Sequence, residues 1–266
     1  PWDMAASMNL DPELTLHEAV FPRPVFTADD RAALDKRLTR TEWAQPAIGC
    51  ASLSYLALTR KVGLEPSAVA GHSYGEVTAL HAAGLYDEAT MLRIARRRGE
   101  LMADAAKGDG AMTAVAQKAD VVLATLHEFG INDVVLANHN HPTQVILSGP
   151  TAAVEQAEEA LATRDMMCRR LPVATAFHSS VVAEAEAPFR AFLTDIPGEL
   201  SKDGPTVYAN TSAAPYASDW RDTLSGQVTR PVRWVELIER MVADGVRHFV
   251  EVGPGGVLTG LIDRTL

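Results

Sequence analysis

The sequence contains little cysteine and no long apolar run. It has two cysteines in 266 residues, Cys50 and Cys168, with neither the spacing of a metal site nor that of a disulfide framework. This favours a reducing cytoplasm, with both thiols expected to be buried apolar groups. No apolar stretch approaches the ~20 residues of a membrane-spanning helix, and no signal peptide is visible. A disulfide-stapled secreted module and a membrane-spanning protein are therefore excluded.

Basic residues are also in deficit. The chain has 34 acidic and 24 basic residues, which gives a formal net charge of −10. This balance argues against nucleic-acid binding and against an anionic membrane surface, so any anionic ligand needs a local cationic site. Since 47% of the residues are hydrophobic, the chain can bury the core of one large domain or two unequal ones. The chain begins at Pro1 without an initiator methionine, which suggests a fragment or an excised domain.

Residues 71–76, with the sequence GHSYGE, join a short apolar run at 68–70 to a helical stretch at 77–83. This is the pattern of a strand, a sharp turn and a helix, and it places Ser73 between two glycines. A nucleophile on such a turn needs glycine neighbours for its backbone and for the incoming acyl group. The N–H of Tyr74, at the start of the helix, is a natural donor to an oxyanion. A glycine-rich turn with an incidental serine is the competing interpretation.

A helix is predicted for residues 88–105, with Asp87 as its cap, and it carries one inward arginine. At about 100° per residue, Arg98 lies in the middle of the apolar face. That face comprises Met91, Ile94, Ala95, Leu101 and Met102, and the arginines that point away are Arg93, Arg96 and Arg97. A buried guanidinium must meet a protein carboxylate or a ligand anion. A structural ion pair and a snorkelling side chain remain open alternatives.

The middle of the chain predicts the order β, α, β, β, α, β, which is a ferredoxin-like unit. Its strands are expected at 111–116, 133–138, 144–147 and 167–171, and its helices at 118–129 and 151–163. His139, Asn140 and His141 fall in the turn between the second and third of these strands. A metal site there is conceivable, but without a third ligand nearby a polar loop is favoured.

The flanking segments alternate strands and helices, which indicates a parallel α/β layer fold. Helices are expected at about 47–62, after Pro46, and at 219–226 and 232–243, and strands at 205–210 and 246–252. A small-residue loop, residues 175–180, contains His178. This histidine is a candidate general base for a serine, although a lone histidine more often caps a helix or sits in a core.

Taken together, these motifs resemble the malonyl-CoA:acyl carrier protein transacylase family, in particular the acyltransferase domains of polyketide synthases, including iterative, polyunsaturated-fatty-acid-like ones. The resemblance covers nearly the whole chain. Its landmarks are Gln45-Pro46-Ala47, GHSYGE at 71–76, Arg98-Gly99, Asn140 and Pro142 before 145–149, Phe177-His178-Ser179, Gln227 followed by 231–234, and residues 251–255. GHSYGE alone is a moderate signal, whereas seven landmarks in this order are specific.

The resemblance implies an α/β-hydrolase-like large subdomain with a parallel sheet, formed by residues 1–110 and 174–266. Residues 111–173 would be the inserted ferredoxin-like small subdomain. Ser73 would be acylated, His178 would act as its base, and Arg98 would hold the distal carboxylate of an extender unit. Gln227 would orient His178 through its backbone carbonyl. The residues implied to line the substrate pocket are Gln45, His72, Tyr74, Asn140 and Phe177.

The same resemblance implies malonyl-CoA as donor and the phosphopantetheine arm of a carrier protein as acceptor, with no bound cofactor or metal. Neighbouring synthase domains are further expected partners. The residues ending at the histidine, Thr-Ala-Phe-His at 175–178, are similar to the His-Ala-Phe-His of malonyl-selective domains. The bulk of Phe177 would fill the space that an α-methyl group needs, although a methyl group is worth only ~1–3 kcal/mol.

One feature of the family does not appear in this sequence. The Gly-Gln-Gly segment that supplies the second oxyanion N–H does not precede Pro1, so that donor is unassigned.

Two other functions compete with acyl transfer. An α/β-hydrolase shares G-x-S-x-G but needs an acid and a late histidine, for which His248, inside an apolar run, is the available residue. A domain that only docks a carrier protein is the nonenzymatic alternative. The presence of Ser73, Arg98 and His178 together argues against it.

Overall fold

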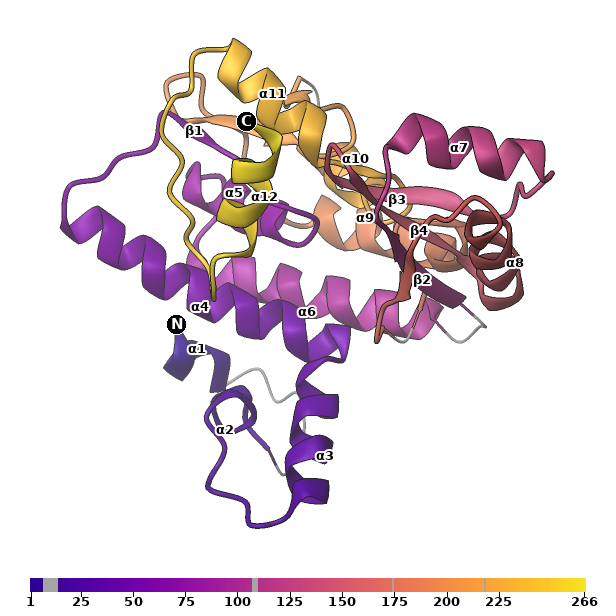
Figure 1. Ribbon diagram of the computed structural model, residues 1–266. Helices are drawn as coiled ribbons and strands as arrows, with labels where there is room; N and C mark the ends of the chain where they lie inside the picture. The colour runs from indigo at the N-terminus through magenta and orange to yellow at the C-terminus, as the bar shows by residue number, and fades with distance from the viewer. Residues whose placement is uncertain (7–13, 107–109, 174, 218) are drawn as a thin grey trace.

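A computed structural model describes residues 1–6, 14–106, 110–173, 175–217 and 219–266 (Figure 1). The helices are α1 (Trp2–Ala6), α2 (Leu16–Val20), α3 (Ala28–Leu38), α4 (Thr41–Lys61), α5 (Gly75–Ala82), α6 (Glu88–Ala105), α7 (Ala119–Glu128), α8 (Thr151–Ala162), the 3₁₀ helix η1 (Ser180–Ala185), α9 (Glu186–Thr194), α10 (Trp220–Gly226), α11 (Trp234–Ala243) and α12 (Val257–Thr265). The strands are β1 (Ala68–Val69), β2 (Gly110–Val115), β3 (Val135–His141), β4 (Gln144–Pro150), β5 (Cys168–Arg170), β6 (Thr206–Ala209), β7 (Ala214–Pro215) and β8 (Val232–Arg233). Among the described helices, none is long and apolar enough to cross a bilayer.

A short sheet carries the serine turn. Its order is β1-β6-β7, and β1 runs parallel to β6, with Ala68 opposite Thr206. The chain leaves β1 through the glycine-rich turn and enters α5, in which every residue from Glu76 to Ala82 is buried. Because these two strands are parallel neighbours, the segments after β1 and after β6 leave the sheet at the same end and lie close together. The strand, turn and helix predicted around Ser73 are confirmed.

The second sheet has the strand order β5-β2-β4-β3-β8. Its first four strands, with α7 and α8, have the ferredoxin-like order, and neighbouring strands among them are antiparallel. Strand β8 pairs in parallel with β3, so residues 232–233 are a strand where the sequence predicted the start of a helix. Their backbone groups bond to an existing sheet edge, a tertiary contact that local pattern does not reveal. The boundaries 1–110 plus 174–266 and 111–173 stay a prediction.

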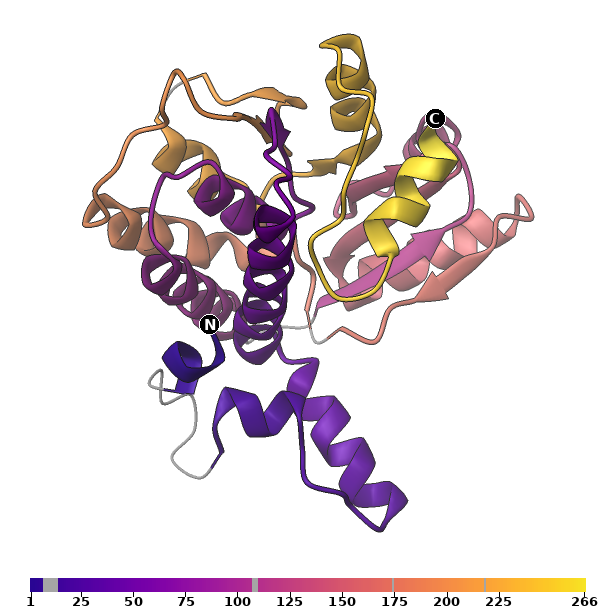
Figure 2. The ribbon, with the colours of Figure 1, turned by 90° about the vertical axis from the view of Figure 1, so that its left-hand side faces the viewer.

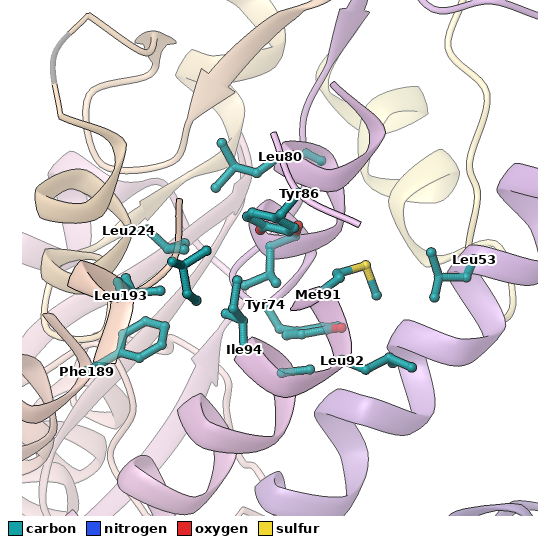
Figure 3. Close-up of a cluster of buried hydrophobic side chains, with 14 of the residues drawn as sticks. Leu53, Tyr74, Leu80, Tyr86, Met91, Leu92, Ile94, Phe189, Leu193 and Leu224 are labelled. Carbon is teal, nitrogen blue, oxygen red and sulfur yellow. The ribbon is translucent and has the colours of Figure 1, made fainter. Parts of the chain in front are cut away.

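The main core lies around α5 and α6. Helices α4 and α6 lie side by side below α5 (Figures 1 and 2). Figure 3 shows side chains from α4, α5, α6, α9 and α10 meeting in one cluster, which includes Leu53, Leu80, Ile94, Phe189 and Leu224. The predicted apolar face of α6 is confirmed, because all five of its residues are buried together with Arg98. Cys50 is fully buried as expected, whereas Cys168 is only partly covered.

Several helix boundaries follow from caps. The Asp87 carboxylate accepts from the backbone N–H of Thr90, and Thr27 caps α3 in the same way. Gly63, which follows α4, has a φ of 78°, as a C-terminal glycine cap requires. The start of α4 was predicted wrongly: the helix begins at Thr41, and Pro46 lies inside it. Proline there costs one intrahelical hydrogen bond in the second turn, which the burial of the helix offsets.

The strand predicted at 246–252 is not formed. This segment is irregular and, together with Ala68, Trp234 and Ile262, lines a cavity of about 360 Å³. A strand needs a neighbour to accept its backbone hydrogen bonds, and among the described residues no strand pairs with this segment. The apolar pattern predicts a strand here, but the pattern does not supply a pairing partner.

A pair of glycine substitutions tests how closely α4 and α6 pack. A methyl group on Gly99 would lie 2.7 Å from both Cα of Glu42 and the Thr41 carbonyl oxygen, whereas one on Gly260 in α12 would meet nothing within 4 Å. We expect Gly99→Ala to lower the free energy of unfolding by about 1–3 kcal/mol. Gly260→Ala should leave it unchanged or raise it by up to ~1 kcal/mol. Urea denaturation measures both values, and equal effects would contradict the close approach of the two helices.

Candidate functional site

Ser73 sits in a strained turn that only a glycine at position 71 permits. Its φ is 52°, in the left-handed region that a non-glycine residue seldom adopts. A Cβ on Gly71 would lie 1.9 Å from the carbonyl carbon of Gly75, whereas a Cβ on Gly75 would meet nothing within 4 Å. Gly71 is therefore needed by the turn itself, and the space beside Gly75 is left open. The Ser73 N–H donates to Asn210 Oδ1 at 2.7 Å, which fixes the turn from β6.

His178 contacts the serine hydroxyl directly. Its Nε2 lies 2.8 Å from Ser73 Oγ, and its Nδ1 lies 2.9 Å from the Gln227 carbonyl oxygen and 3.0 Å from that of Arg230. Because carbonyl oxygens only accept, Nδ1 carries the proton and Nε2 is free to accept from the serine. The structure brings these two predicted residues together and holds the histidine through the Gln227 carbonyl, as the resemblance implied.

Burial keeps this imidazole neutral. Desolvation, reinforced by the positive charge of Arg98, lowers the pKa of His178 to about 3. The backbone φ of His178 is 56°, and its N–H donates to the Val228 carbonyl oxygen at 3.2 Å. Both members of the Ser73–His178 pair thus have strained backbones that neighbouring segments hold in place.

Arg98 is 1% exposed and has no carboxylate as a direct partner among the described residues. Its Nη1 donates to Gln45 Oε1 at 2.9 Å, and its Nη2 donates to Gln227 Oε1 at 2.8 Å. Its Nε has no hydrogen-bond partner. Burial lowers the pKa of Arg98 to about 10, which leaves it charged at neutral pH. A buried guanidinium held by two neutral oxygens, with an N–H left over, is suited to a ligand anion.

Both glutamines present oxygen to Arg98 because their nitrogens are used elsewhere. Gln45 Nε2 donates to Thr41 Oγ1 at 2.6 Å. Gln227 Nε2 donates to the Ser73 carbonyl oxygen at 2.8 Å and to Glu76 Oε2 at 2.9 Å. The side-chain amide of Gln227 therefore connects the arginine to the serine turn, while its backbone carbonyl orients the histidine.

His72 in the serine turn and Asn140 on β3 of the second sheet form a pair. His72 Nε2 lies 2.8 Å from Asn140 Oδ1, and the His72 ring packs against Trp234 with 5.5 Å between centroids. Asn140 lies on β3, so the prediction that residues 139–141 form a turn was wrong. His139 in this strand pairs with Glu236 at 3.1 Å. No group of three or more His, Cys, Asp or Glu in the described part of the chain could hold a metal.

Phe177 is fixed by the second sheet, and Tyr74 faces the core. Ser148 on β4 donates its hydroxyl to the Phe177 carbonyl oxygen at 2.7 Å, and the half-buried Phe177 side chain packs between two hydrophobic clusters. The Tyr74 ring is 6% exposed and points towards α4 and α6, near Met91 and Leu92 (Figure 3). Its side chain therefore does not line a pocket beside Ser73, contrary to the prediction. The role of its backbone N–H stays a prediction.

Glu76, Asn210 and Tyr216 complete the buried network, and the sequence analysis assigned them no role. Glu76 Oε2 accepts from the Asn210 N–H at 3.0 Å, and Glu76 Oε1 accepts from the Tyr216 hydroxyl. The Asn210 amide also donates to the Gly71 carbonyl oxygen at 2.6 Å. Asn210 could have been found, because it follows a strand expected to lie parallel to the one before Ser73. The position of Tyr216 has no such signal.

The comparisons with known proteins agree on one family. Residues 4–266 match the family described as acyl transferase domain. The chain is 37% identical over 231 residues to the polyketide biosynthesis malonyl CoA-acyl carrier protein transacylase PksC of Bacillus subtilis, covering 85% of this chain and 79% of PksC. It is also 37% identical over 231 residues to the polyketide biosynthesis protein PksE of the same organism, covering 85% of this chain but only 30% of PksE.

Among solved structures, the fold is similar to one described as a type II polyketide synthase acyl-carrier protein in complex with its malonyl-transacylase. The TM-score is 0.87 at 28% sequence identity, covering all of this chain and 83% of the matched one. The fold class expected from the sequence, an α/β-hydrolase-like unit with an inserted ferredoxin-like unit, is confirmed by such neighbours.

The neutral state of His178 predicts an unusual pH profile. Because its pKa is lowered to about 3, the imidazole should accept the Ser73 proton equally well from pH 5 to pH 8. We expect the rate constant for modification of Ser73 by an uncharged fluorophosphonate to change less than about twofold over this range. His178→Ala should lower it by about 10²–10⁴-fold. A loss of rate on acidification with a midpoint near pH 6.5 would contradict the prediction.

Proposed function

The chain belongs to the acyl transferase domain family, and we propose that it transfers a malonyl group from coenzyme A to the phosphopantetheine thiol of an acyl carrier protein. The observation that carries this proposal is the buried Arg98, whose guanidinium adjoins the Ser73–His178 pair through Gln227. A serine and its base can transfer many acyl groups. A buried cation beside them favours an acyl group that carries its own carboxylate.

In the first half-reaction, Ser73 Oγ attacks the thioester carbonyl of malonyl-CoA while His178 Nε2 takes the hydroxyl proton. The tetrahedral intermediate then collapses, the carbon–sulfur bond breaks, and the proton passes from His178 to the departing sulfur. Malonyl-Ser73 and free CoA result. In the second half-reaction the carrier thiol gives its proton to His178 and attacks the ester, which regenerates the serine hydroxyl. Because CoA leaves before the carrier thiol attacks the malonyl-serine ester, the kinetics should be ping-pong.

Two carbonyl oxygens, those of Gln227 and Arg230, take the place of the acid in a serine triad. They orient Nδ1–H but add little negative charge to stabilise an imidazolium. A thioester suits this weaker arrangement, because a thiolate leaves more readily than an amine. The N–H of Tyr74, at the first turn of α5, is our proposed donor to the oxyanion.

The pocket proposed around this centre combines residues of α4, the serine turn, strand β3 and the loops before η1 and after α10. Gln45 and Gln227 hold Arg98, while His72 and Asn140 pair with each other. Phe177 immediately precedes the catalytic histidine, where its bulk would oppose an α-methyl group on the acyl chain. We therefore propose malonyl over methylmalonyl as the preferred extender.

The α/β-hydrolase alternative would use a late histidine, rather than His178, as the base for Ser73. His248, the late histidine of that alternative, lines the cavity between β1 and α12, whereas the Ser73 hydroxyl bonds to His178. The solved complex with an acyl-carrier protein supports a carrier protein as the acceptor. The partial coverage of PksE supports partnership with neighbouring synthase domains, and two free cysteines support a reducing, cytoplasmic setting.

The first test is the mass of the protein after mixing with malonyl-CoA or acetyl-CoA. We expect a malonyl adduct that is absent in Ser73→Ala. Arg98→Ala should reduce malonyl loading about 10- to 100-fold and change acetyl loading much less, because a charge-assisted hydrogen bond contributes about 1.5–3 kcal/mol.

Arg97→Ala is the matched control for this test, since Arg97 is on the same helix with its side chain 41% exposed. It should load both acyl groups as the unmodified protein does. Equal loss of malonyl and acetyl loading in Arg98→Ala would refute the role of Arg98 as a clamp for the acyl carboxylate. Rapid loss of the adduct to water without transfer to a carrier protein would favour a hydrolase.

The second test concerns extender selectivity. We expect Phe177→Ser to increase methylmalonyl loading relative to malonyl loading by about 5- to 150-fold, because removing the ring opens space for a methyl group worth ~1–3 kcal/mol. Competition between the two CoA esters, followed by mass spectrometry of the loaded protein, measures the ratio. Phe129→Ser, at an exposed position at the C-terminal end of α7, is the control. An unchanged ratio would remove Phe177 from the selectivity argument.

A further inference from the structure

One carboxylate and one guanidinium are buried among the residues that the structure describes. Among the buried polar residues in the described part of the chain, Glu76 is the only Asp or Glu, and Arg98 is the only Arg or Lys. Glu76 is 0% exposed and Arg98 is 1% exposed. A lone buried cation is costly, so the placement of the only buried anion near it requires an explanation.

The two charges do not form a direct ion pair. The side-chain amide of Gln227 lies between them, accepting from Arg98 Nη2 at 2.8 Å and donating to Glu76 Oε2 at 2.9 Å. The two charges stabilise each other. The Glu76 charge opposes the burial that lowers the pKa of Arg98, and the Arg98 charge opposes the burial that raises the pKa of Glu76. Glu76 therefore neutralises Arg98 without occupying its N–H groups.

The charge of Arg98 is thus balanced by one residue, Glu76, while its direct hydrogen bonds go to two others, Gln45 and Gln227. If Glu76 bonded Arg98 directly, an incoming carboxylate would have to displace it. With neutral amide oxygens as its direct partners, the guanidinium keeps Nε unpartnered in a buried site. When Glu76 is ionised, the Arg98 charge is balanced in the unliganded protein, and a donor remains available to a ligand.

We propose that Glu76 is the counter-ion of Arg98, separated from it by the side-chain amide of Gln227. Its negative charge repels the acyl carboxylate and so sets the affinity of Arg98 for that carboxylate. Glu76 is thus a positioning and tuning residue rather than a catalytic one. This inference rests on the proposed function, in which Arg98 binds the malonyl carboxylate. It predicts that removing the Glu76 charge strengthens malonyl binding and leaves acetyl binding unchanged.

The pH dependence follows from the groups that face Glu76. Burial raises the pKa of Glu76 to about 7, although hydrogen bonds from Tyr216, Asn210 and Gln227 oppose the rise. Arg98 from α6 stays charged, with its pKa near 10, and Tyr86 and Tyr216 stay neutral because burial raises the pKa of each well above 10. His178 is neutral above about pH 3. Between pH 6 and 8, Glu76 is the member of this group that changes charge.

Glu76→Gln removes the charge and preserves the hydrogen bonds. Its amide oxygen can accept from Asn210 and Gln227, and its amide nitrogen can donate to the Tyr216 oxygen. At pH 8 we expect the malonyl-CoA concentration for half-maximal loading of Ser73 to fall about 3- to 10-fold, with the acetyl-CoA value unchanged. In the unmodified protein this malonyl-CoA concentration should rise from pH 6 to pH 8, because Glu76 ionises, whereas in Glu76→Gln it should stay constant.

Two further variants test whether the effect comes from the Glu76 charge or from a change in structure. Tyr216→Phe removes a hydrogen bond that lowers the pKa of Glu76, so the midpoint of the malonyl transition should move above pH 7. Glu65→Gln makes the same change of net charge at an exposed site and should change nothing. Quenched-flow loading of the intact protein, read by mass spectrometry, supplies all of these values, and circular dichroism confirms that each variant is folded.

The outcomes distinguish failure of the Glu76 counter-ion role from failure of the proposed function. Equal changes for malonyl-CoA and acetyl-CoA in Glu76→Gln, weaker malonyl loading, or an unaltered pH dependence would overturn the counter-ion role. If Glu76→Gln fails to fold, an unmoved midpoint in Tyr216→Phe overturns it instead. If Arg98→Ala leaves the ratio of malonyl to acetyl loading unchanged, the clamp itself fails, and with it the proposed function.

Discussion

The rest of the site depends on keeping the Arg98 charge inside the protein. A guanidinium removed from water must recover its lost hydration from nearby dipoles and charges. Here it does so through two amide oxygens and, beyond one of them, a carboxylate. Each of these groups is anchored in turn: Gln45 by Thr41, and Glu76 by Asn210 and Tyr216. The buried polar network is largely the means by which one cation is accommodated.

The same network restrains the reacting atoms. Ser73 and His178 both have left-handed backbones, which cost roughly 1–3 kcal/mol each and persist only where the surroundings hold them. Asn210 holds the serine turn from two sides, through the N–H of Ser73 and the carbonyl of Gly71. The histidine is held by backbone groups of Gln227, Val228 and Arg230. The segments after β6 and after α10 therefore set the distance between nucleophile and base.

Much of this could be predicted from local pattern, and the remainder depends on tertiary contact. Helix 88–105 was predicted with its cap and its inward arginine, because the amphipathic period and the Asp87 cap are encoded within one segment. Residues 246–252 have an apolar strand pattern, but no pattern specifies whether a partner strand is present. Glu76 belonged to the motif yet was assigned no role, since its importance arises from Asn210 and Tyr216, which lie more than a hundred residues further along the chain. The sequence motifs therefore identify Ser73, His178 and Arg98, whereas the carboxylate that balances the Arg98 charge is identified only by the fold.

Gln227 shows why acyl recognition and chemistry cannot be separated in this protein. Its backbone carbonyl orients the base, while its side-chain amide joins the arginine to the serine turn and to Glu76. A carboxylate that binds Arg98 would therefore act on a residue that also touches both members of the Ser73–His178 pair. Movement of this one amide would change the clamp and the nucleophile together, because its oxygen and nitrogen face opposite partners. An acyl group that binds Arg98 would therefore have to do so without displacing Gln227.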